Sequence, residues 1–445
     1  MFKSIGFLPS KLCFLSFIAA GLAFIQKADA QQSKLVNVAS GWANNTVNTV
    51  VFRKNALVTW KDTQFIAFYN QQHYVVLGKR KIGSEKWELK QTSFTGNTAD
   101  AHNCISIMVD GEGYLHVSWD HHGSKLHYSR SVSPGSLTML APLSMTGIEE
   151  SSVTYPEFYR LANGNLLFLY RSGASGKGNL VLNRYDIKTH QWNQLYSNLI
   201  DGEGRRNAYW QAFVDVKGII HISWVWRESA DVASNHDLCY ARSTDGGITW
   251  EKSTGEKYTL PVTAATAEYI CHISQKSELI NQTSMYADEN GEPYIATYWK
   301  EKNDSVPQYH FVYHQQKKWY VQSLSFRKTP FTLSGGGSKR IPIARPQIIS
   351  WISSNSRNIG IVFRDEERGN KLSIAVFKTN FPKNILIKDI TDFSIGSSEP
   401  LYDTELWKEQ KKLNFFIQYT EQIDGEGKAD IPPTPVQVLE WNYSH

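Results

Sequence analysis

The feature that most constrains this chain is a pair of strand-like runs that recurs along it. Each run is rich in Val, Ile, Tyr, Phe and Trp, and a turn containing Gly or Asn joins the two runs of a pair. Self-similarity of this kind indicates one repeat architecture rather than several unrelated domains. The pairs are Cys104–Val109 with Tyr114–Asp120, Glu157–Leu161 with Leu166–Tyr170, Gln211–Val216 with Ile219–Trp226, Thr283–Ala287 with Glu292–Trp299, and Gln347–Ile352 with Ile359–Phe363, with weaker versions at residues 56–69 and 403–419.

A second pair of strands follows each hairpin, for example at Lys125–Ser131 and Asn179–Tyr185. Four strands per unit, repeated seven times at a spacing of roughly 45–60 residues, predict an all-β chain folded as a seven-bladed β-propeller with four antiparallel strands per blade. The segment Leu35–Phe52 is expected to add the outer strand that closes the last blade. A pair of β-sandwiches is the alternative, but it does not explain seven hairpins in phase.

The first thirty residues have the pattern of a signal peptide. A basic start precedes the apolar run Leu12–Ile25, which is too short to span a bilayer comfortably, and Ala28 and Ala30 are the small residues that a signal peptidase reads. We therefore expect residues 1–30 to be removed and the protein to be exported to the periplasm or the medium. Residues 31–445 contain no long linker, so a single propeller domain with no membrane span is expected.

The charge of the chain excludes some partners. The formal net charge of +5 falls to about +3 without Lys3, Lys11, Lys27 and Asp29, and no block of Lys and Arg is present. A weak basic excess of this kind argues against nucleic acid as the main partner. It is compatible with an anionic polysaccharide if the positive side chains gather in one place.

The phase of the repeat brings a set of polar residues to one face. In a propeller, the residues just before the first strand and just after the second strand of each blade converge around the same mouth of the central channel. The separations within four of these pairs are 20, 16, 18 and 19 residues, which is close to constant. The residues at these positions are His102 and His122, Tyr155 and Arg171, Tyr209 and Arg227, Lys300, and Arg345 and Arg364.

This set has a chemical meaning. A cluster of Arg and Lys favours a carboxylate, and neutralising a uronic acid carboxylate allows the neighbouring proton to be removed. A His or Tyr must take that proton, and another group must protonate the leaving oxygen. His102, His122, Tyr155 and Arg171 are the predicted catalytic residues, and Tyr209, Arg227, Lys300, Arg345 and Arg364 the predicted substrate contacts. The alternative is that all are ordinary hairpin-end residues.

Several stretches resemble the BNR-4 propeller family, which includes ulvan lyases, rhamnose–glucuronate lyases and α-L-rhamnosidases that act on arabinogalactan side chains. The resemblance covers essentially the whole mature chain. It implies that His102 and His122 are the histidine pair of the lyases, that Tyr155 and Arg171 are their Tyr and carboxylate-neutralising Arg, and that Arg227 contacts the substrate. The stretches are Asp100–Asn103, Ser118–His122, Tyr155–Phe158, Leu169–Asn179 and Trp224–Glu228.

The resemblance implies a lyase acting by β-elimination, most simply on the L-rhamnose-α-1,4-D-glucuronate linkage of arabinogalactan-type glycans. Ulvan is the alternative substrate and would be cleaved by the same reaction. In either case the expected partner is an anionic plant or algal polysaccharide. The rhamnosidases of the family use a histidine near the first blade, and residues 31–72 contain none. Few carboxylates lie at the mouth positions, which also counts against a conventional hydrolase. A glycan-binding propeller without catalysis is the third hypothesis.

One turn carries a structural mark. Ser243–Trp250 matches the Asp-box pattern S-x-D-x-G-x-T-W of sialidase-type propellers, in which Asp and Gly stabilise a tight turn. This turn is expected on the rim of the propeller, away from the chemistry.

The cysteines and neighbouring histidines suggest a metal. After residue 30 the chain contains Cys104, Cys239 and Cys271, an odd number that cannot form a complete set of disulfides. His236, Cys239, Cys271 and His272 together offer four ligands of the kind that zinc prefers, and the resemblance implies a structural metal. We therefore predict a structural zinc site at these residues and no cofactor for the chemistry. A buried cysteine beside an unrelated loop is the alternative.

Overall fold

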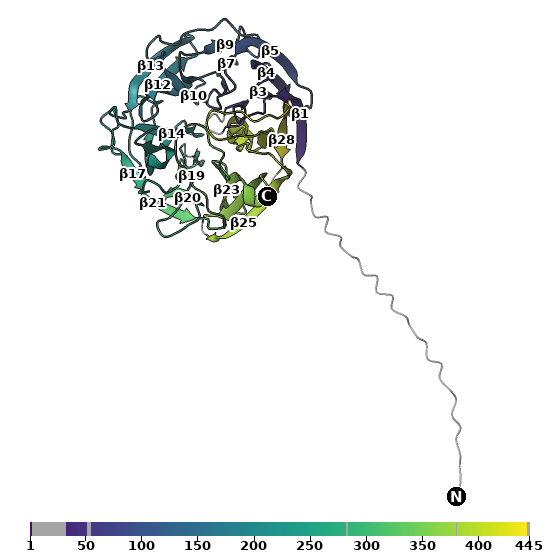
Figure 1. Ribbon diagram of the computed structural model, residues 1–445, viewed down its shortest axis with the longest axis vertical. Coiled ribbons are helices and arrows are strands. Elements are labelled where there is room, and N and C mark those ends of the chain that lie inside the picture. Colours follow the sequence, from purple (N-terminus) through teal and green to yellow (C-terminus); the bar gives the residue numbers. More distant parts are fainter. Residues whose placement is uncertain (2–32, 51–54, 282–283, 380, 443–445) are drawn as a thin grey trace.

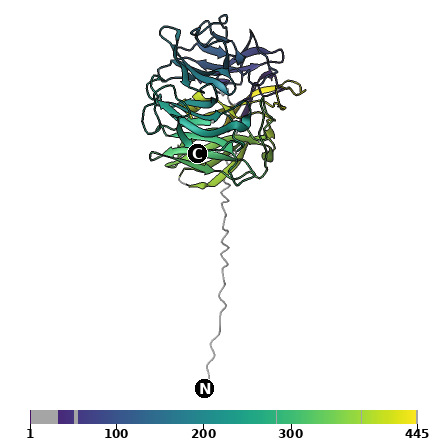
Figure 2. The same ribbon diagram turned by 60° about the vertical axis from the view of Figure 1, so that its left-hand side comes forward.

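The computed structural model describes Met1 and residues 33–50, 55–281, 284–379 and 381–442. The predicted signal peptide, apart from Met1, lies outside the described residues. Figures 1 and 2 show seven antiparallel sheets arranged around one axis in chain order, which confirms the predicted seven-bladed propeller.

In each blade the strands lie one after another from the central channel outward. The innermost strands are β2 (Leu57–Trp60), β6 (Ser106–Val109), β10 (Val153–Arg160), β14 (Asn207–Val214), β18 (Ser284–Ala287), β22 (Gln347–Ser353) and β26 (Leu401–Tyr402). The second strands are β3 (Thr63–Tyr69), β7 (Leu115–Ser118), β11 (Leu166–Ala174), β15 (Ile220–Arg227), β19 (Pro293–Trp299), β23 (Ser356–Asp365) and β27 (Leu413–Ile417).

The outer half of each blade completes the sheet. The third strands are β4 (Tyr74–Lys81), β9 (Tyr128–Arg130), β12 (Lys177–Asp186), β16 (Asn235–Ser243), β20 (Gln308–Gln315), β24 (Lys371–Lys378) and β28 (Thr434–Trp441). The outermost strands are β5 (Glu88–Thr95), β13 (Gln191–Ile200), β17 (Glu268–Cys271), β21 (Lys318–Ser323), β25 (Phe381–Ser394) and β1 (Lys34–Gly41).

Two blades depart from the regular pattern. In the second blade, isolated bridges from Met139 and Leu143 to the β9 edge take the place of a fourth strand. The third blade has an additional short strand, β8 (His122–Ser124), which pairs with the inner edge of β10. This pairing places His122 at the channel mouth rather than within its own blade.

The ring is closed by the two ends of the described chain. β1 pairs antiparallel with β28, from Lys34 opposite Glu440 to Gly41 opposite Thr434, and the two strands lie side by side in Figure 1. The predicted closing segment Leu35–Phe52 therefore supplies the outer strand of the last blade, but the strand ends at Gly41, and residues 51 and 52 lie outside the described residues.

Three of the innermost hairpins share one type of turn. Asp110, Asp215 and Asp288 each accept hydrogen bonds from the backbone N–H groups two and four residues later, and a glycine with positive φ follows three residues after each aspartate. In two blades the second carboxylate oxygen contacts a buried histidine, His116 or His221, at 3.2 and 3.3 Å. The repeat seen in the sequence is thus a repeated buried hydrogen-bond network as well as a hydrophobic pattern.

The last blade departs from the prediction. Where a hairpin turn was expected within residues 403–419, helix α1 (Thr404–Gln410) follows β26, with the Asp403 side chain accepting a hydrogen bond from the Leu406 N–H at its N-terminus. Its side chains contact three other blades: Glu405 binds Arg160 at 2.7 Å, Trp407 donates to the Tyr286 hydroxyl, and Lys408 lies over the Phe213 ring. The helix, a coiled ribbon near the centre of the ring in Figure 1, therefore occupies the end of the channel that lies opposite the predicted mouth.

Among the described residues are two short 3-10 helices, Val232–Ser234 and Glu366–Arg368. Within the described part of the chain, no helix has the length and apolar character needed to cross a bilayer.

Candidate active site

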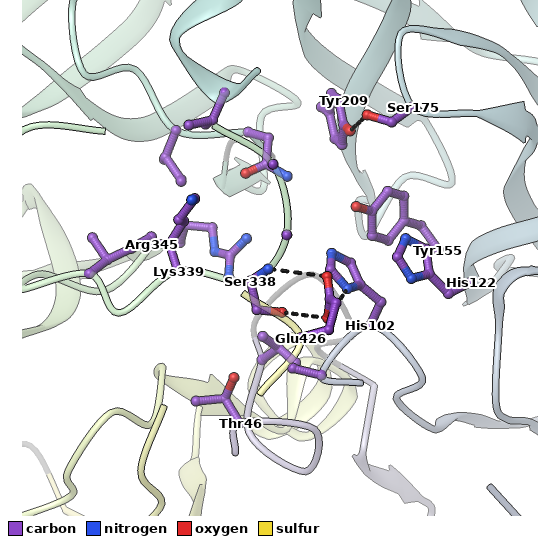
Figure 3. A pocket seen from close by; sticks show the side chains of 18 of the residues that line it. Thr46, His102, His122, Tyr155, Ser175, Tyr209, Ser338, Lys339, Arg345 and Glu426 are labelled. Atoms are coloured by element: carbon purple, nitrogen blue, oxygen red, sulfur yellow. Dashed lines mark hydrogen bonds and ion pairs between the residues drawn. The ribbon is translucent and has the colours of Figure 1, made fainter. Parts of the chain in front are cut away.

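The channel mouth holds a cavity of about 270 Å³. It is lined by seven of the nine residues predicted from the phase of the repeat, and Figure 3 shows several of them facing one another across it. These seven are His102, His122, Tyr155, Arg171, Tyr209, Arg227 and Arg345.

The two histidines form a stacked pair held by one carboxylate. Their ring centroids lie 4.1 Å apart with an interplanar angle of 18°. The Nδ1 atoms of His102 and His122 lie 2.7 and 2.6 Å from the two carboxylate oxygens of Asp100. This orientation turns the Nε2 edge of both rings away from Asp100. Asp100 was not among the predicted site residues, although its position two residues before His102 is a signal that could have identified it.

The charges around His102 favour its protonated form. Its Nδ1 also lies 3.5 Å from Oε2 of Glu426, which comes from the loop between β27 and β28. Burial disfavours the imidazolium, but the hydrogen bonds and charges of Asp100 and Glu426 outweigh burial and raise the pKa of His102 to about 9. Burial likewise disfavours the Asp100 carboxylate, and the two histidines nevertheless hold the pKa of Asp100 well below its usual range.

The same four residues have the composition of a metal site. One ligand atom from each of Asp100, His102, His122 and Glu426 lies within 4.8 Å of the others. However, a ligating imidazole directs its lone pair in the ring plane, and one ion cannot lie in the planes of two rings that stack in parallel 4.1 Å apart. We therefore interpret these four residues as a network of hydrogen bonds and opposite charges rather than as a metal site.

Tyr155 is aimed at the histidines by an irregular strand. The β10–β11 register shifts between Thr154 and Glu157, and Tyr155 has φ = 57°, in the left-handed region. A bulge of this kind re-aims side chains and is common beside active sites. The Tyr155 ring lies 6.0 Å from the His102 ring and 5.7 Å from the Tyr209 ring.

Arg171 is a buried cation in the cavity, and two of its guanidinium nitrogens lack hydrogen-bond acceptors among the described residues. Its side chain is buried, and its Nε and Nη1 atoms have no hydrogen-bond partner among the described residues. The guanidinium lies over the Tyr155 ring at 5.0 Å. An unpaired buried guanidinium costs free energy unless an anion occupies its donors. The arrangement therefore fits a carboxylate ligand.

Tyr209 and Arg227 form a second polar group beside Arg171. The Tyr209 hydroxyl lies 3.2 Å from Nη1 of Arg227 and 3.1 Å from the Ser175 hydroxyl. Burial favours the neutral phenol, but the charges of Arg227 and Arg171 oppose it and lower the pKa of Tyr209 to about 8. A Tyr of this kind can exchange a proton near neutral pH, a role that the prediction of a substrate contact did not include.

The remaining predicted cations behave differently. Arg345 lines the cavity and pairs with Glu399 at 2.9 Å. Arg364 is buried beside the cavity and donates to the backbone carbonyls of Ser398, Pro342 and Ile341. Lys300 lies 3.5 Å from Glu278 and does not line the cavity. The structure thus does not bring Arg364 and Lys300 to the cavity surface with the others, because their side chains bind to neighbouring loops.

The structure does not assemble the four predicted zinc ligands. Both ring nitrogens of His236 contact carboxylates, Glu228 at 2.8 Å and Asp237 at 2.9 Å, and the His272 side chain is 82% exposed. Cys239 is fully buried on β16, and the four side chains do not form a group of potential metal ligands among the described residues. Burial raises the pKa of both thiols, to about 12 for Cys271. These residues therefore do not fit a tetrahedral zinc site.

Comparison with known proteins identifies ulvan lyases among the relatives of this chain. The chain is 23% identical over 329 residues to a long-isoform ulvan lyase of Alteromonas sp and 27% identical over 328 residues to one of Pseudoalteromonas sp. (strain PLSV). Each alignment covers 58% of this chain and 33% of the relative, so the chain spans about one third of the length of these proteins.

Solved structures share the fold. The polysaccharide lyase Uly1 superposes with a TM-score of 0.65 at 16% identity, covering 94% of each chain. A PL25 ulvan lyase bound to -[GlcA(1-4)Rha3S]- superposes with a TM-score of 0.62 at 13% identity, covering 91% of this chain and 95% of that one.

The family model described as "BNR repeat-containing family member" matches residues 63–327, which is more than half of the chain and confirms the resemblance noted in the sequence. The protein therefore belongs to the family of BNR repeat-containing propellers.

Proposed function

We propose that this protein is a polysaccharide lyase of the ulvan lyase type, which cleaves by β-elimination beside a uronic acid. The observation that carries the proposal is the buried Arg171, whose unpartnered donors share one cavity with a stacked histidine pair. The similarity to ulvan lyases over 58% of the chain supports it.

Arg171 and Arg227 bind and neutralise the uronate carboxylate in this proposal. Both guanidinium groups lie on one side of the cavity, joined through the Tyr209 hydroxyl and the Tyr155 ring. Neutralising the carboxylate acidifies the C-5 hydrogen, because the charge that develops on proton removal is spread onto the carboxylate oxygens.

The histidine pair supplies the proton transfers. When Nδ1–H of His122 donates to Asp100, Nε2 keeps its lone pair and can accept the C-5 proton. The electron pair of the broken C-5–H bond forms the double bond between C-4 and C-5. The bond between C-4 and the leaving oxygen breaks at the same time. His102, which is protonated at neutral pH, donates a proton to the leaving oxygen.

The stereochemistry of glucuronate suits this arrangement. In a D-glucuronate ring, the C-5 hydrogen and the C-4 oxygen lie on the same face, so base and acid must approach from one side. His102 and His122 lie side by side on one wall of the cavity, with ring centroids 4.1 Å apart. A pair of this spacing can serve both atoms at once.

The identity of the glycan substrate is a further part of the proposal. Ulvan is the first candidate, because the relatives are ulvan lyases and the superposed lyase is bound to a segment of glucuronate and 3-sulfated rhamnose. The rhamnose–glucuronate linkage of arabinogalactan-type glycans is the second, because elimination at a glucuronate C-4 requires the same groups. Hydrolysis from the opposite face is disfavoured by helix α1, whose side chains bind residues of three other blades there.

The test is to incubate the protein with ulvan and with gum arabic, recording ultraviolet absorbance and product masses. We expect an unsaturated uronate that absorbs in the ultraviolet and is lighter by one water than the hydrolysis fragment. His122→Ala should abolish this signal. Free rhamnose without absorbance would identify a hydrolase instead, and polymer binding without any product would identify a glycan-binding propeller.

A further inference from the structure

A loop crosses the mouth of the cavity and is fixed at both of its sides. This strap, residues 335–340, belongs to the connection between β21 and β22. On one side, Gly335 N–H donates to Asp231 at 2.6 Å and the Gly335 carbonyl accepts from Val232 at 3.0 Å. Asp231 and Val232 follow β15, in a different blade, so the strap reaches across a blade boundary.

The other side of the strap is bound to the loop between β27 and β28. The Ser338 N–H donates to Glu426 at 3.3 Å, and its carbonyl accepts from the Gly425 N–H at 2.9 Å. Arg340 N–H donates to Asp424 at 2.9 Å. Contacts to two loops from distant parts of the chain fix the position of the strap over the cavity.

The strap carries one cation into the cavity. Lys339 lines it and is half-buried; no hydrogen bond or salt bridge of its ammonium is found among the described residues, and its charge interacts with the nearby Asp231 carboxylate. The nearby carboxylates are engaged elsewhere: Asp231 accepts from Gly335 and Ala233, and Glu399 binds Arg345. Glu426 accepts from Ser338 and faces His102.

Lys339 lies across the cavity from the proposed carboxylate site. Figure 3 shows Lys339 and Arg345 on one side, and Tyr209, Tyr155 and His122 on the other. A uronate held by Arg171 therefore places the neighbouring sugar toward the strap. A Lys ammonium is a compact, strongly hydrated charge that suits a single oxyanion at a partly solvated position.

We propose that Lys339 forms a second anion subsite of this cavity, for a sulfate ester or carboxylate carried by the sugar next to the uronate. The inference rests on the proposed lyase function and extends it: the enzyme recognises two negative charges on adjacent sugars. A sulfate ester is the ligand we expect, because an ester sulfate stays ionised at all working pH values.

The test compares Lys339→Met with Lys339→Arg on native and chemically desulfated ulvan. Lys339→Met removes the charge and keeps the apolar stem, so we expect KM on native ulvan to rise about fivefold, the effect of an ion pair of about 1 kcal/mol, with little change in kcat. Lys339→Arg should retain the wild-type KM. The exposed Lys302, which lies outside the cavity, provides the matched control Lys302→Met.

The two polymers separate the sources of the anion. A rise in KM on native ulvan alone supports a sulfate subsite, whereas an equal rise on both polymers identifies a carboxylate of a second uronate as the ligand. Wild-type KM values for Lys339→Met on both polymers would overturn the subsite while elimination itself continued.

A binding measurement keeps the test independent of catalysis. If the wild-type protein forms no unsaturated product from native ulvan, desulfated ulvan or gum arabic, the proposed function fails, and calorimetric titration with ulvan oligosaccharides still reports on the subsite. Weaker binding by Lys339→Met than by Lys302→Met, and only for sulfated oligosaccharides, would then support it. Equal binding by the two variants would contradict it.

Discussion

At the scale of single residues, the site contains one buried charge, Arg171, that is poorly paired among the described residues. Arg171 has two buried donors without acceptors among the described residues, and Asp100 uses both of its oxygens to hold two histidines. Buried charges are normally paired, because desolvation makes an unpaired one costly. Stability is thus sacrificed where an anionic ligand is expected, and the cost is offset when the ligand binds.

Arg171 is expected to require its planar fork as well as its charge. Lysine keeps the charge but cannot bind a carboxylate through two parallel hydrogen bonds. We expect Arg171→Lys to lower kcat/KM on ulvan by about 100-fold, measured from the rate of ultraviolet absorbance. Arg184→Lys on β12, outside the cavity, is the control. Undiminished activity of Arg171→Lys would show that the positive charge alone suffices and that the planar fork is not required.

Glu426 is expected to help keep His102 protonated. Its carboxylate lies 3.5 Å from Nδ1 of His102 and raises the pKa of that residue. Removing the negative charge destabilises the imidazolium, so Glu426→Gln should lower the pKa of His102 from about 9 toward its ordinary value of 6.5. Titration of the histidine ring signals by NMR measures this directly, and the alkaline limb of kcat/KM should move to lower pH.

Glu421 is in the same loop and does not line the cavity, so Glu421→Gln is the matched control. A His102 titration that is identical in Glu426→Gln and the wild type would show that Asp100 alone sets its pKa.

At the scale of elements, turns and loops divide into structural and functional groups. The aspartates of the innermost hairpins, and Asp245 on the rim, bind backbone N–H groups and fix tight turns. The strap and the loop that carries Glu426 instead bind each other across the cavity. The first kind follows from local sequence, and the second depends on contacts between distant loops.

The Asp-box turn provides a test of this division. Asp245 accepts hydrogen bonds from the Ser243 hydroxyl, the Ile248 and Thr249 N–H groups and the Thr249 hydroxyl, at 2.7–3.0 Å. Asp245→Ala leaves these donors to solvent, and we expect a cost of about 1–2 kcal/mol, measured as a lower Tm. Because the turn does not line the cavity, kcat/KM at 25 °C should be unchanged; a substantial loss of activity would place the rim in the chemistry.

At the scale of the whole molecule, the ring depends on one joint. β1 pairs with β28 over seven residue pairs and supplies the outer strand of the last blade, so strands from the two ends of the described chain complete a single sheet. A propeller keeps only short, protected strand edges, and β1 covers the outer edge of β28. The cavity residues come from several blades, so their geometry depends on this closure.

Removal of the closing strand should therefore destabilise the entire ring. A variant that begins at Trp42 lacks β1, and we expect a Tm at least several degrees lower and reduced lyase activity, followed by circular dichroism and product absorbance. A variant that begins at Lys34 keeps the strand and is the control. Equal Tm values for the two variants would mean that the last blade is stable with three strands.

The fold, the number of blades, the closing strand and the face on which seven of the nine predicted residues meet could all be predicted from local sequence patterns. These features follow from local patterns, namely strand alternation, turn residues and a constant spacing, which repeat with the same geometry wherever they occur. His102 and Arg171 could be placed at the mouth from their positions in the repeat, whereas His122 reaches it on the additional strand β8.

The contacts of these residues depend on the folded arrangement of distant segments. Glu426 reaches His102 from a loop more than 300 residues away, and Lys339 enters the cavity on a strap fixed by two other loops. The same dependence explains why Lys300 lies outside the cavity and why the predicted zinc ligands remain apart. Periodicity specifies where a strand ends, but the path of the loop beyond it, and the sheet face of each side chain next to a bulge, depend on packing between segments that are distant in the chain.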